Sequence, residues 1–431
     1  MNKTQLEAPA EAGADSQRLV LVNISGQDRV GLMSELTLAL AKVDTQVLDI
    51  GQAIVHNQLV LSLLVRLPAD EESSRTVIAE VESLANERGV TLSLSPVLEE
   101  AYQQWVDQQG QPRYILTLLT KALSAQQLAA VSSVTSRHGL NILNVERLSN
   151  RVPLAAVAAP GAQERRASVA MTLRGSISDQ TLLKTDLLAA GGDLDFDCSV
   201  QLDSVYRRNR RLVAFDMDST LIQVEVIDEL ARLHGVYEQV AEITRRAMAG
   251  ELDFQESFRA RAMLLKGMSR TALDEVADNV ALTEGAETLI NALKHFGYTI
   301  ALLSGGFQFV GDRLKNRLGI DHVHANALVF VDGIATGEVR GEIVDAAAKA
   351  RILTTLCTAE GISPEQAIAV GDGANDLPML AAAGLGIAFH AKPLVRSSAG
   401  HAISHFGLDS VLYLLGFSDS EIERVSQGDS D

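Results

Sequence analysis

Hydrophobic and polar positions alternate in the first half of the chain in a pattern that predicts the same small unit twice. Each unit reads as a strand, a helix, two strands, a helix and a last strand. In the first unit we expect strands at 18–24, 46–56, 59–68 and 90–97, with helices at 32–44 and 73–89. In the second we expect strands at 113–120, 140–149, 166–175 and 193–204, with helices at 124–139 and 178–192. This repeat predicts two α+β domains, each a small sheet with two helices on one face.

Segments without such a pattern mark the boundaries of the expected domains. Residues 1–17 are small and polar, which predicts a disordered leader. The Ala- and Pro-rich stretch RVPLAAVAAPGAQER at 151–165 predicts an exposed loop inside the second unit. We therefore expect a leader, a first unit at 18–98, a second unit at 112–202, a third domain at 208–420 and a flexible polar tail at 421–431.

Strands and helices alternate from Arg211 onward, which predicts an α/β domain with a Rossmann-like parallel sheet covered on both faces. The expected strands are RLVAFD (211–216), TIALLS (299–304), HVHANALVF (322–330), AIAVGD (367–372) and GLGIAF (384–389). The stretch 328–339 also predicts a β-hairpin that turns at Asp332 and Gly333. Three of the strands end in Asp216, Ser304 and Asp372, at the sheet edge where ligands bind in this architecture.

Composition excludes several classes of partner. The formal net charge of −18 argues against nucleic acid, because phosphate backbones are bound by clustered Lys and Arg. The N-terminus has no apolar signal region, and acids and glycines interrupt the apolar runs, so we expect no membrane span. Two cysteines, Cys198 and Cys357, fit a reducing compartment. The prediction is a soluble, cytoplasmic protein.

The residues at the strand ends suit phosphoryl chemistry. Asp216 and Asp218 in DMDST can ligate a cation. However, two neighbouring acids with no other signal also occur at simple bends. Ser304 and Gly305 in LLSGGF can hold an anion through a hydroxyl and backbone amides, although a glycine turn after a strand is common. Lys349, on a helical Ala-rich stretch, would be an ordinary solvated lysine unless it serves an anionic substrate.

The loop VGDGANDLPML at 370–380 carries the most specific signal. Asp372, Asn375 and Asp376 crowd one glycine-rich strand-to-helix loop, a ligand set suited to Mg²⁺. Carboxylates, a cation, a phosphate cradle and a lysine at one edge predict phosphoryl transfer. The chemistry alone leaves two routes open, direct attack by water or a covalent aspartyl-phosphate.

DMDST, SGGF, a following Lys and GDGANDLPML occur in the order that is typical of the haloacid dehalogenase-like phosphatases, which this half of the chain resembles. The resemblance implies that Asp216 is the nucleophile and a Mg²⁺ ligand, and that Asp218 is the general acid and base. The backbone carbonyl of Asp218 and the side chain of Asp372 would complete the metal shell. Asp376 would orient Lys349 or a metal-bound water.

The same resemblance implies the phosphate site and the substrate. Ser304, Gly305 and Lys349 would hold phosphate oxygens, and Asn375 would help to place substrate and water. The segments EVIDE (225–229) and MAGELDFQESFRARAMLLKG (248–267) are similar to the phosphoserine phosphatase branch of that family.

The insertion at about 226–283 should then be a mostly helical, mobile cap that selects the substrate. Glu225 would bind the ammonium of O-phospho-L-serine and Arg261 its carboxylate, with Met248 and Phe254 as an apolar wall. Each charge alone could be an ordinary surface residue. The expected activity is a Mg²⁺-dependent phosphatase at the last step of L-serine biosynthesis. The alternatives are a phosphatase for phosphohomoserine or another small phosphate, and an amino-acid sensor with an inactive phosphatase half.

The two N-terminal units resemble tandem ACT domains, which have a ferredoxin-like α+β fold. The resemblance rests on the element order and on the loop SGQDRVG at 25–31, which the second unit lacks. It implies an amino-acid effector at these domains and a homodimer. In the alternative interpretation Gly26 and Gly31 only permit a tight turn, while Asp28 caps the following helix.

Overall fold

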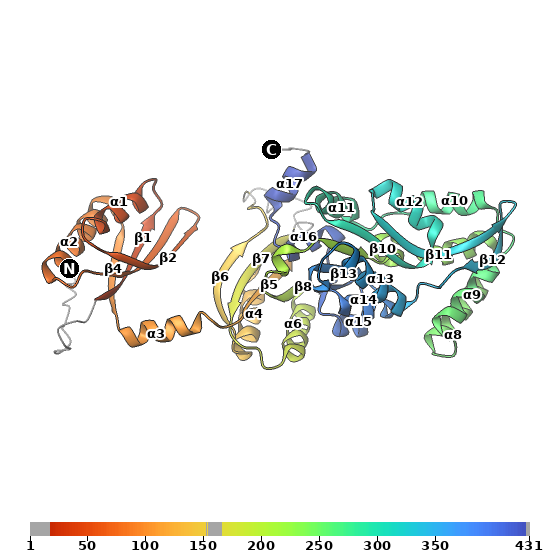
Figure 1. Ribbon diagram of the computed structural model, residues 1–431, viewed down its shortest axis with the longest axis horizontal. Helices are drawn as coiled ribbons and strands as arrows, with labels where there is room; N and C mark the ends of the chain where they lie inside the picture. Colours follow the sequence, from red (N-terminus) through yellow and green to blue (C-terminus); the bar gives the residue numbers. More distant parts are fainter. Residues whose placement is uncertain (1–17, 152, 154–165, 428–431) are drawn as a thin grey trace. The chain divides into compact units, whose positions relative to one another are not determined.

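The computed structural model describes residues 18–151, 153 and 166–427. The expected leader at 1–17 and almost all of the expected loop at 151–165 therefore lie outside the described residues. The chain divides into two compact units, Met1–Gln111 and Pro112–Asp431 (Figure 1). In the part of the chain that the structure describes, no helix is both long and apolar enough to cross a membrane.

The first unit has the predicted strand and helix order. Its elements are β1 (Leu19–Gln27), α1 (Leu32–Leu40), β2 (Gln46–Val55), β3 (Gln58–Arg66), α2 (Glu71–Arg88), β4 (Thr91–Val97) and α3 (Glu99–Gln108). The antiparallel sheet has the order β2-β3-β1-β4. Alternate residues of β1, Val20, Val22 and Ile24, are buried in the core beneath the helices. The sequence did not predict helix α3.

The loop before α1 follows only part of the turn-and-cap interpretation. Gly31 has a φ of 98°, a left-handed conformation that glycine adopts readily, and it precedes the helix. A Cβ on Gly26 would lie 2.9 Å from Cγ1 of Val90, so a larger residue would collide there. However, no side chain caps α1, so Asp28 does not have the capping role of that interpretation.

The second unit begins with another domain of the same topology. Its elements are β5 (Arg113–Thr120), α4 (Ala125–Arg137), β6 (Asn141–Arg147), β7 (Ala167–Arg174), α6 (Gln180–Leu194) and β8 (Phe196–Leu202). The sheet order is β6-β7-β5-β8. Strand β8 packs against the third domain, where the carboxylate of Asp197 accepts hydrogen bonds from the backbone N–H groups of Ser404 and His405, both at 2.9 Å.

The third domain contains a seven-stranded sheet in the order β12-β11-β10-β9-β13-β14-β15. The strands are β9 (Leu212–Phe215), β10 (Thr299–Phe307), β11 (His322–Val331), β12 (Ile334–Arg340), β13 (Ala367–Gly371), β14 (Leu385–Phe389) and β15 (His401–Ile403). All but β12 run parallel, and β11 and β12 form the predicted hairpin, with Asp332 and Gly333 both at positive φ.

Helices cover both faces of this sheet, so its central strands are buried on both sides. Val213 and Phe215 of β9 pack into one hydrophobic core, whereas Leu212 and Ala214 pack into another. The helices outside the cap are α11 (Ala286–His295), α12 (Gln308–Leu318), α13 (Ala346–Ala359), α14 (Leu377–Ala382), α15 (Pro393–Ser398), α16 (Val411–Leu415) and α17 (Asp419–Gln427). The short helices are η2 (Arg207–Asn209), η3 (Met217–Leu221), η4 (Pro364–Gln366), η5 (Ala374–Asp376) and η6 (Leu408–Ser410).

Four helices lie between β9 and β10 in the region predicted to be a helical insertion. They are α7 (Val226–His234), α8 (Tyr237–Met248), α9 (Phe254–Leu264) and α10 (Arg270–Asn279). Helix α9 starts with a capping box, in which Asp253 and Glu256 satisfy each other's backbone N–H groups. Its buried residues include Phe258, which belongs to the same core as Phe215.

The tail that was predicted to be flexible, at 421–431, overlaps a helix. Residues Asp419–Gln427 form helix α17, and residues 428–431 lie outside the described part of the chain. Ile422 and Val425 pack against the core, and helix α17 contacts α11. The polar composition concealed this helix, because only a narrow apolar stripe is needed to hold a short helix on a domain surface.

Candidate active site

The carboxyl ends of β9, β10 and β13 bring the predicted polar residues to one edge of the sheet. Asp216 directly follows β9, Ser304 lies near the end of β10, and Asp372 directly follows β13. The backbone N–H of Asp216 donates to the carbonyl of Val370 at 2.9 Å, which holds the two acidic loops side by side. The fold therefore brings together Asp216 and Asp372, which are more than 150 positions apart in the chain. Their places at strand ends had predicted this.

Lys349 connects two of the acids at this edge. Its Nζ lies 2.5 Å from Oδ1 of Asp216 and 2.6 Å from Oδ1 of Asp376, and all three side chains are buried. Lys349 is in the first turn of α13, where the side chain of Asp345 caps the helix by accepting from the N–H of Ala348 at 2.9 Å. The cap sets the start of the helix and so places the lysine.

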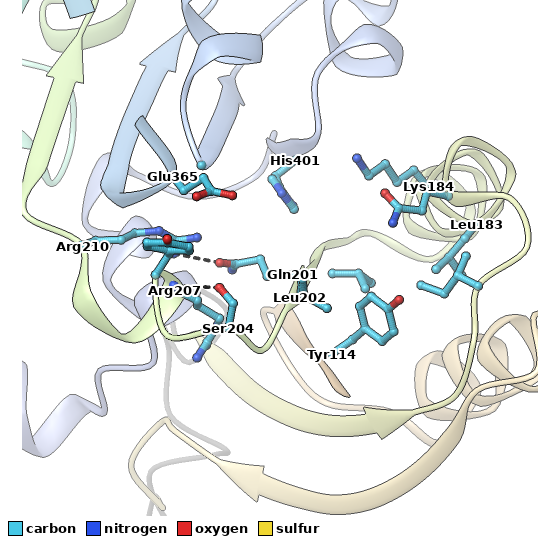
Figure 2. A pocket seen from close by; sticks show the side chains of 15 residues that line it. Tyr114, Leu183, Lys184, Gln201, Leu202, Ser204, Arg207, Arg210, Glu365 and His401 are labelled. Atoms are coloured by element: carbon cyan, nitrogen blue, oxygen red, sulfur yellow. Dashed lines mark hydrogen bonds between the residues drawn. The ribbon is translucent and has the colours of Figure 1, made fainter. Parts of the chain in front are cut away.

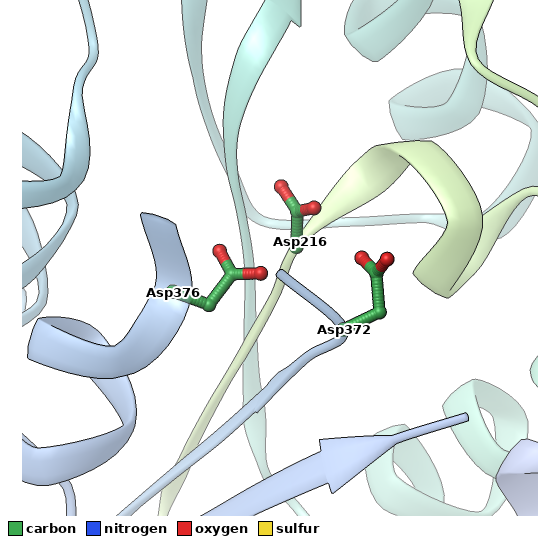
Figure 3. A group of neighbouring side chains, drawn as sticks. All are labelled: Asp216, Asp372 and Asp376. Atoms are coloured by element: carbon green, nitrogen blue, oxygen red, sulfur yellow. The ribbon is translucent and has the colours of Figure 1, made fainter. Parts of the chain in front are cut away.

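Asp372 joins the two acids that contact Lys349 to form a group of three carboxylates. One oxygen each of Asp216, Asp372 and Asp376 lies within 4.8 Å of the others (Figure 3). Burial and the charge of Asp376 raise the pKa of Asp216, and burial with the charges of Asp376 and Glu225 raises the pKa of Asp372 to about 6. Burial disfavours the ammonium of Lys349, but Asp216 and Asp376 outweigh it and raise its pKa.

This charge balance fits a cation. Of the groups in this cluster only the ammonium of Lys349 opposes the three carboxylates, so an additional positive charge would stabilise the arrangement. Carboxylate oxygens are the ligands that hard divalent cations prefer. Asp376 was expected to orient Lys349, and it contacts Lys349, but its carboxylate also belongs to the group that could hold a metal.

The side chain of Asp218 is not among the carboxylates of that group. Ser219 has a φ of 57°, and the chain turns so that Oδ1 of Asp218 accepts a hydrogen bond from the N–H of Val226 at 3.1 Å. Burial, followed by the charge of Glu225, raises the pKa of Asp218 to about 8. A carboxyl group that keeps its proton near neutral pH can give that proton to a leaving group.

The glycines of SGGF are required by close contacts. A Cβ on Gly305 would lie 2.8 Å from Cζ of Phe254, and one on Gly306 would lie 2.6 Å from Oδ2 of Asp218. Oγ of Ser304 accepts a hydrogen bond from the N–H of Gly306 at 2.8 Å. This loop therefore passes directly under the carboxyl group of Asp218 and the first residue of α9.

Sequence reasoning missed two side chains that support the site. The hydroxyl of Thr220 donates to Oδ1 of Asp372 at 3.1 Å. The buried side chain of Asn326 donates to the carbonyl of Gly305 at 2.8 Å and accepts from the N–H of Val344 at 2.8 Å. Local sequence contains no signal for these contacts, because each partner lies far away in the chain or in another loop.

The predicted recognition residues lie at the cap side of the site. Oε1 of Glu225 accepts from the hydroxyl of Ser219 at 2.9 Å, and Glu225 is exposed. Arg261 is partly buried and makes no ion pair among the described residues, although Glu225, Asp228 and Asp218 act on its pKa, which burial lowers. A guanidinium in this position can donate hydrogen bonds to the carboxylate of a ligand.

Two further predictions concern Asn375 and the apolar wall. Asn375 lies in η5, partly buried, with Oδ1 packed against Gly373. Phe254 stacks on Phe258 with ring centroids 6.2 Å apart, as an apolar wall requires. Met248, however, lies in the last turn of α8 and is 71% exposed in this structure.

Comparison with known proteins agrees with this geometry. A model of the haloacid dehalogenase-like hydrolases matches residues 210–384, and an ACT domain model matches residues 18–95. A phosphoserine phosphatase of Streptomyces coelicolor is 40% identical over 409 residues, which cover 94% of each chain. The chain belongs to the phosphoserine phosphatase family.

Other members of this family match over similar lengths. Phosphoserine phosphatase SerB2 of Mycobacterium tuberculosis is 35% identical over 95% of this chain and 96% of its own. The crystal structure of a probable phosphoserine phosphatase from Vibrio cholerae is 34% identical, with a TM-score of 0.56, and covers 73% of this chain and 89% of its own. This protein is therefore an enzyme that hydrolyses phosphoric monoesters, with an ACT domain at its N-terminus.

Proposed function

We propose that this enzyme hydrolyses O-phospho-L-serine to L-serine and phosphate through an aspartyl-phosphate on Asp216, as the last step of L-serine biosynthesis. The contact between Lys349 and Asp216 at 2.5 Å carries the proposal. It holds one oxygen of a buried carboxylate beside a fixed positive charge and leaves the other oxygen for attack. The family relationship supports the choice of substrate.

In the first step Oδ2 of Asp216 attacks phosphorus, and the bond between phosphorus and the serine oxygen breaks. The carboxyl group of Asp218 gives its proton to that oxygen, because a serine alkoxide is a poor leaving group. The ammonium of Lys349, the backbone N–H groups of the Gly305 loop and the hydroxyl of Ser304 stabilise the charge on the phosphoryl oxygens.

In the second step a water molecule attacks the phosphorus of the aspartyl-phosphate. The carboxylate of Asp218 removes a proton from this water, and Asp216 leaves as a carboxylate while phosphate is released. Asn375 helps to place the water. Because Asp218 is held by the N–H of Val226 at the start of α7, movement of the cap would be linked to the position of this acid.

Mg²⁺ is the cation that we propose for the carboxylate group. The side chains of Asp216 and Asp372 and the backbone carbonyl of Asp218 would hold it, and Asp376 lies close enough to contribute. When bound, Mg²⁺ would neutralise part of the negative charge of the transferred phosphoryl group. The supporting observation is that three carboxylates lie close together while a single ammonium contacts two of them.

Recognition of serine rests on Glu225 and Arg261. We propose that Glu225 binds the substrate ammonium and that Arg261 binds its carboxylate through two parallel hydrogen bonds. Arg261 has no carboxylate partner among the described residues, and Phe254 lies beside it on α9 and over Gly305. An amino acid attached to the phosphate would therefore reach both charged side chains.

A panel of phosphate monoesters tests this function, with and without Mg²⁺. We expect O-phospho-L-serine to exceed phosphoethanolamine, which lacks the carboxylate, by at least about 100-fold in kcat/KM. Arg261→Gln should remove most of that difference, whereas the surface change Arg259→Gln on the same helix should not. Equal rates for both substrates, or faster hydrolysis of phosphohomoserine, would contradict the assignment of the substrate.

The covalent route has its own test. Asp216→Asn should abolish turnover while leaving the circular dichroism spectrum unchanged, and acid quenching of the wild-type enzyme should trap phosphate on the peptide that contains Asp216. If Asp216→Asn retained turnover, direct attack by water would replace the covalent mechanism.

We further propose that an amino acid such as serine binds to the ACT domains and regulates a cytoplasmic homodimer. The ACT domain model that matches residues 18–95 supports the effector, and the unpaired thiols of Cys198 and Cys357 fit a reducing compartment. The full chain is the right sample, because β8 of the second ACT-like domain packs on the phosphatase domain. Calorimetry should detect serine binding, and its absence would contradict the proposed effector. Sedimentation should give the mass of a dimer, and the mass of a monomer would contradict the proposed homodimer.

A further inference from the structure

A second pocket lies where the second ACT-like domain meets the phosphatase domain (Figure 2). Its volume is about 230 Å³. One wall comes from β5, α6 and β8, and the other from η2, the residues before β13 and the start of β15. The pocket is therefore at the amino ends of the sheet strands, at the edge opposite to Asp216 and Asp372.

Basic groups dominate the lining of this pocket. Lys184 from α6, Arg207 and Arg210 from the connection between the domains, and His401 from β15 all lie there. Glu365, an exposed residue, is the acid in the lining. Among the residues that the structure describes, neither Lys184 nor the two arginines make an ion pair, because the nearby Asp203 pairs with Arg208.

Two of these cations have hydrogen-bonding capacity that the protein leaves unused. Arg210 is 4% exposed, and one terminal nitrogen donates to Oε1 of Gln201 at 2.8 Å, but its buried Nε has no partner among the described residues. The buried Nε of Arg207 also lacks one. An unpaired buried guanidinium N–H costs free energy, and both of these arginines line the pocket.

A chain of hydrogen bonds orients the side chain of His401. Gln201 donates through Nε2 to the hydroxyl of Ser199 at 3.2 Å, and that hydroxyl lies 2.8 Å from Nδ1 of His401. A hydroxyl has one hydrogen and two lone pairs, so Ser199 can donate to Nδ1 of His401 while it accepts from Gln201. In that tautomer Nε2 of His401 carries the ring proton and is a neutral donor.

The ammonium of Lys184 reaches across the domain boundary. Its Nζ lies 3.6 Å from the position that a Cβ on Gly400 would occupy, directly before β15. Burial lowers the pKa of Lys184, and no carboxylate offsets this effect. A charge held in this position without a counter-ion is a cost to the folded protein that a bound anion would remove.

From this geometry we infer that the pocket binds a small anion with a phosphate or carboxylate group, which Lys184 of the ACT-like domain and Arg210 of the phosphatase domain hold together. Tyr114, Leu183 and Val200 supply an apolar wall for a short carbon body. The volume accommodates a metabolite of a few carbon atoms. The bound anion would strengthen the contact between the two domains, because it is contacted from both sides.

Phosphate is the first probe, used with the full-length protein in EDTA. The thermal unfolding midpoint is measured against phosphate concentration at constant ionic strength, for the wild type, Lys184→Gln and the control Lys121→Gln on the surface of the same domain. All three proteins retain the active site, so phosphate binding there cancels in the comparison. We expect the apparent phosphate affinity of Lys184→Gln to fall about tenfold or more, since a charge-assisted hydrogen bond is lost. Lys121→Gln should match the wild type.

Two further experiments distinguish a carboxylate ligand from a phosphate ligand and locate the binding site. Malonate replaces phosphate in the same titration, so that a response to malonate alone assigns a carboxylate and a response to phosphate alone assigns a phosphoryl group. Crystals soaked in selenate should show anomalous density between Lys184 and Arg210. Identical responses of Lys184→Gln and the wild type to both anions, or selenate density confined to the active site, would overturn the proposal.

Discussion

The hydroxyl of Thr220 donates a hydrogen bond to Oδ1 of Asp372 at 3.1 Å, across 152 positions of sequence. Thr220 is fully buried and follows the Asp216 loop by four residues. The hydrogen bond fixes one oxygen of Asp372 and leaves the other for a cation. The segment that carries the proposed nucleophile thus also orients an acid of the proposed metal site, which couples the two proposed functions.

Replacing Thr220 with valine should weaken metal binding more than it weakens catalysis. The side chain keeps its shape but loses the donor, so Asp372 is no longer oriented. We expect the Mg²⁺ concentration for half-maximal activity to rise about 10- to 100-fold, with a smaller change in kcat at saturating Mg²⁺. Thr355→Val, at an exposed hydroxyl on α13, is the control and should leave both values unchanged. An unaltered Mg²⁺ requirement in Thr220→Val would show that this contact has no orienting role.

Gly306→Ala should impair catalysis with little loss of stability. The added Cβ would lie 2.6 Å from Oδ2 of Asp218 and 2.7 Å from Cε of Met217, so Asp218, the proposed general acid, must move. A displacement of about 1 Å is expected to lower kcat about 100-fold. The matched control is Gly192→Ala, where a Cβ meets nothing within 4 Å and the helix gains propensity. Steady-state kinetics and urea unfolding of both variants check this, and full activity of Gly306→Ala would refute it.

Lys349→Met should destabilise the metal-free protein by about 3–5 kcal/mol, because it leaves Asp216 and Asp376 buried without their counter-charge. The exposed pair of Lys294 and Asp321, 3.3 Å apart, offers a comparison: Lys294→Met should cost less than about 1 kcal/mol. Urea unfolding in EDTA measures both values. Equal losses for the two variants would mean that the buried cluster contributes no more than a surface ion pair.

His401 should make the phosphatase domain sensitive to acid. Burial, with the charges of Lys184 and Arg210, lowers its pKa from 6.5 to about 3, so the folded protein keeps the ring neutral. The unfolded chain takes up the proton first as pH falls below about 6.5, and stability is lost progressively between that pH and about 3. Above 6.5 the ring is neutral in both states, and it then contributes no pH dependence.

The comparison of wild type with His401→Gln isolates this effect from the carboxylates that titrate in the same range. We expect the difference in unfolding free energy between the two proteins to shrink or reverse from pH 7 to pH 4.5. Urea titrations at intermediate pH values check the sign. A difference that stays constant with pH would mean that His401 takes up its proton equally in both states.

Some elements were hidden from the sequence for specific reasons. Helices α3 and α17 are short and mainly polar, and packing of Ile422 and Val425 on the domain holds α17. The local sequence pattern also did not predict that Met248 is exposed or that Asp28 does not cap α1. Short segments of this kind have weak intrinsic preferences, so their contacts determine their structure.

By itself the sequence determined the order of strands and helices, the repeat of the N-terminal unit and the chemistry at the ends of three strands. These follow from local periodicity and from the rule that parallel strands end at one edge. Only the tertiary structure decided that Lys349 lies between Asp216 and Asp376, that Thr220 holds Asp372, and that basic groups gather at the domain boundary. Such contacts join residues far apart in the chain, and the geometry that selects them exists only after the sheet and its helices have packed.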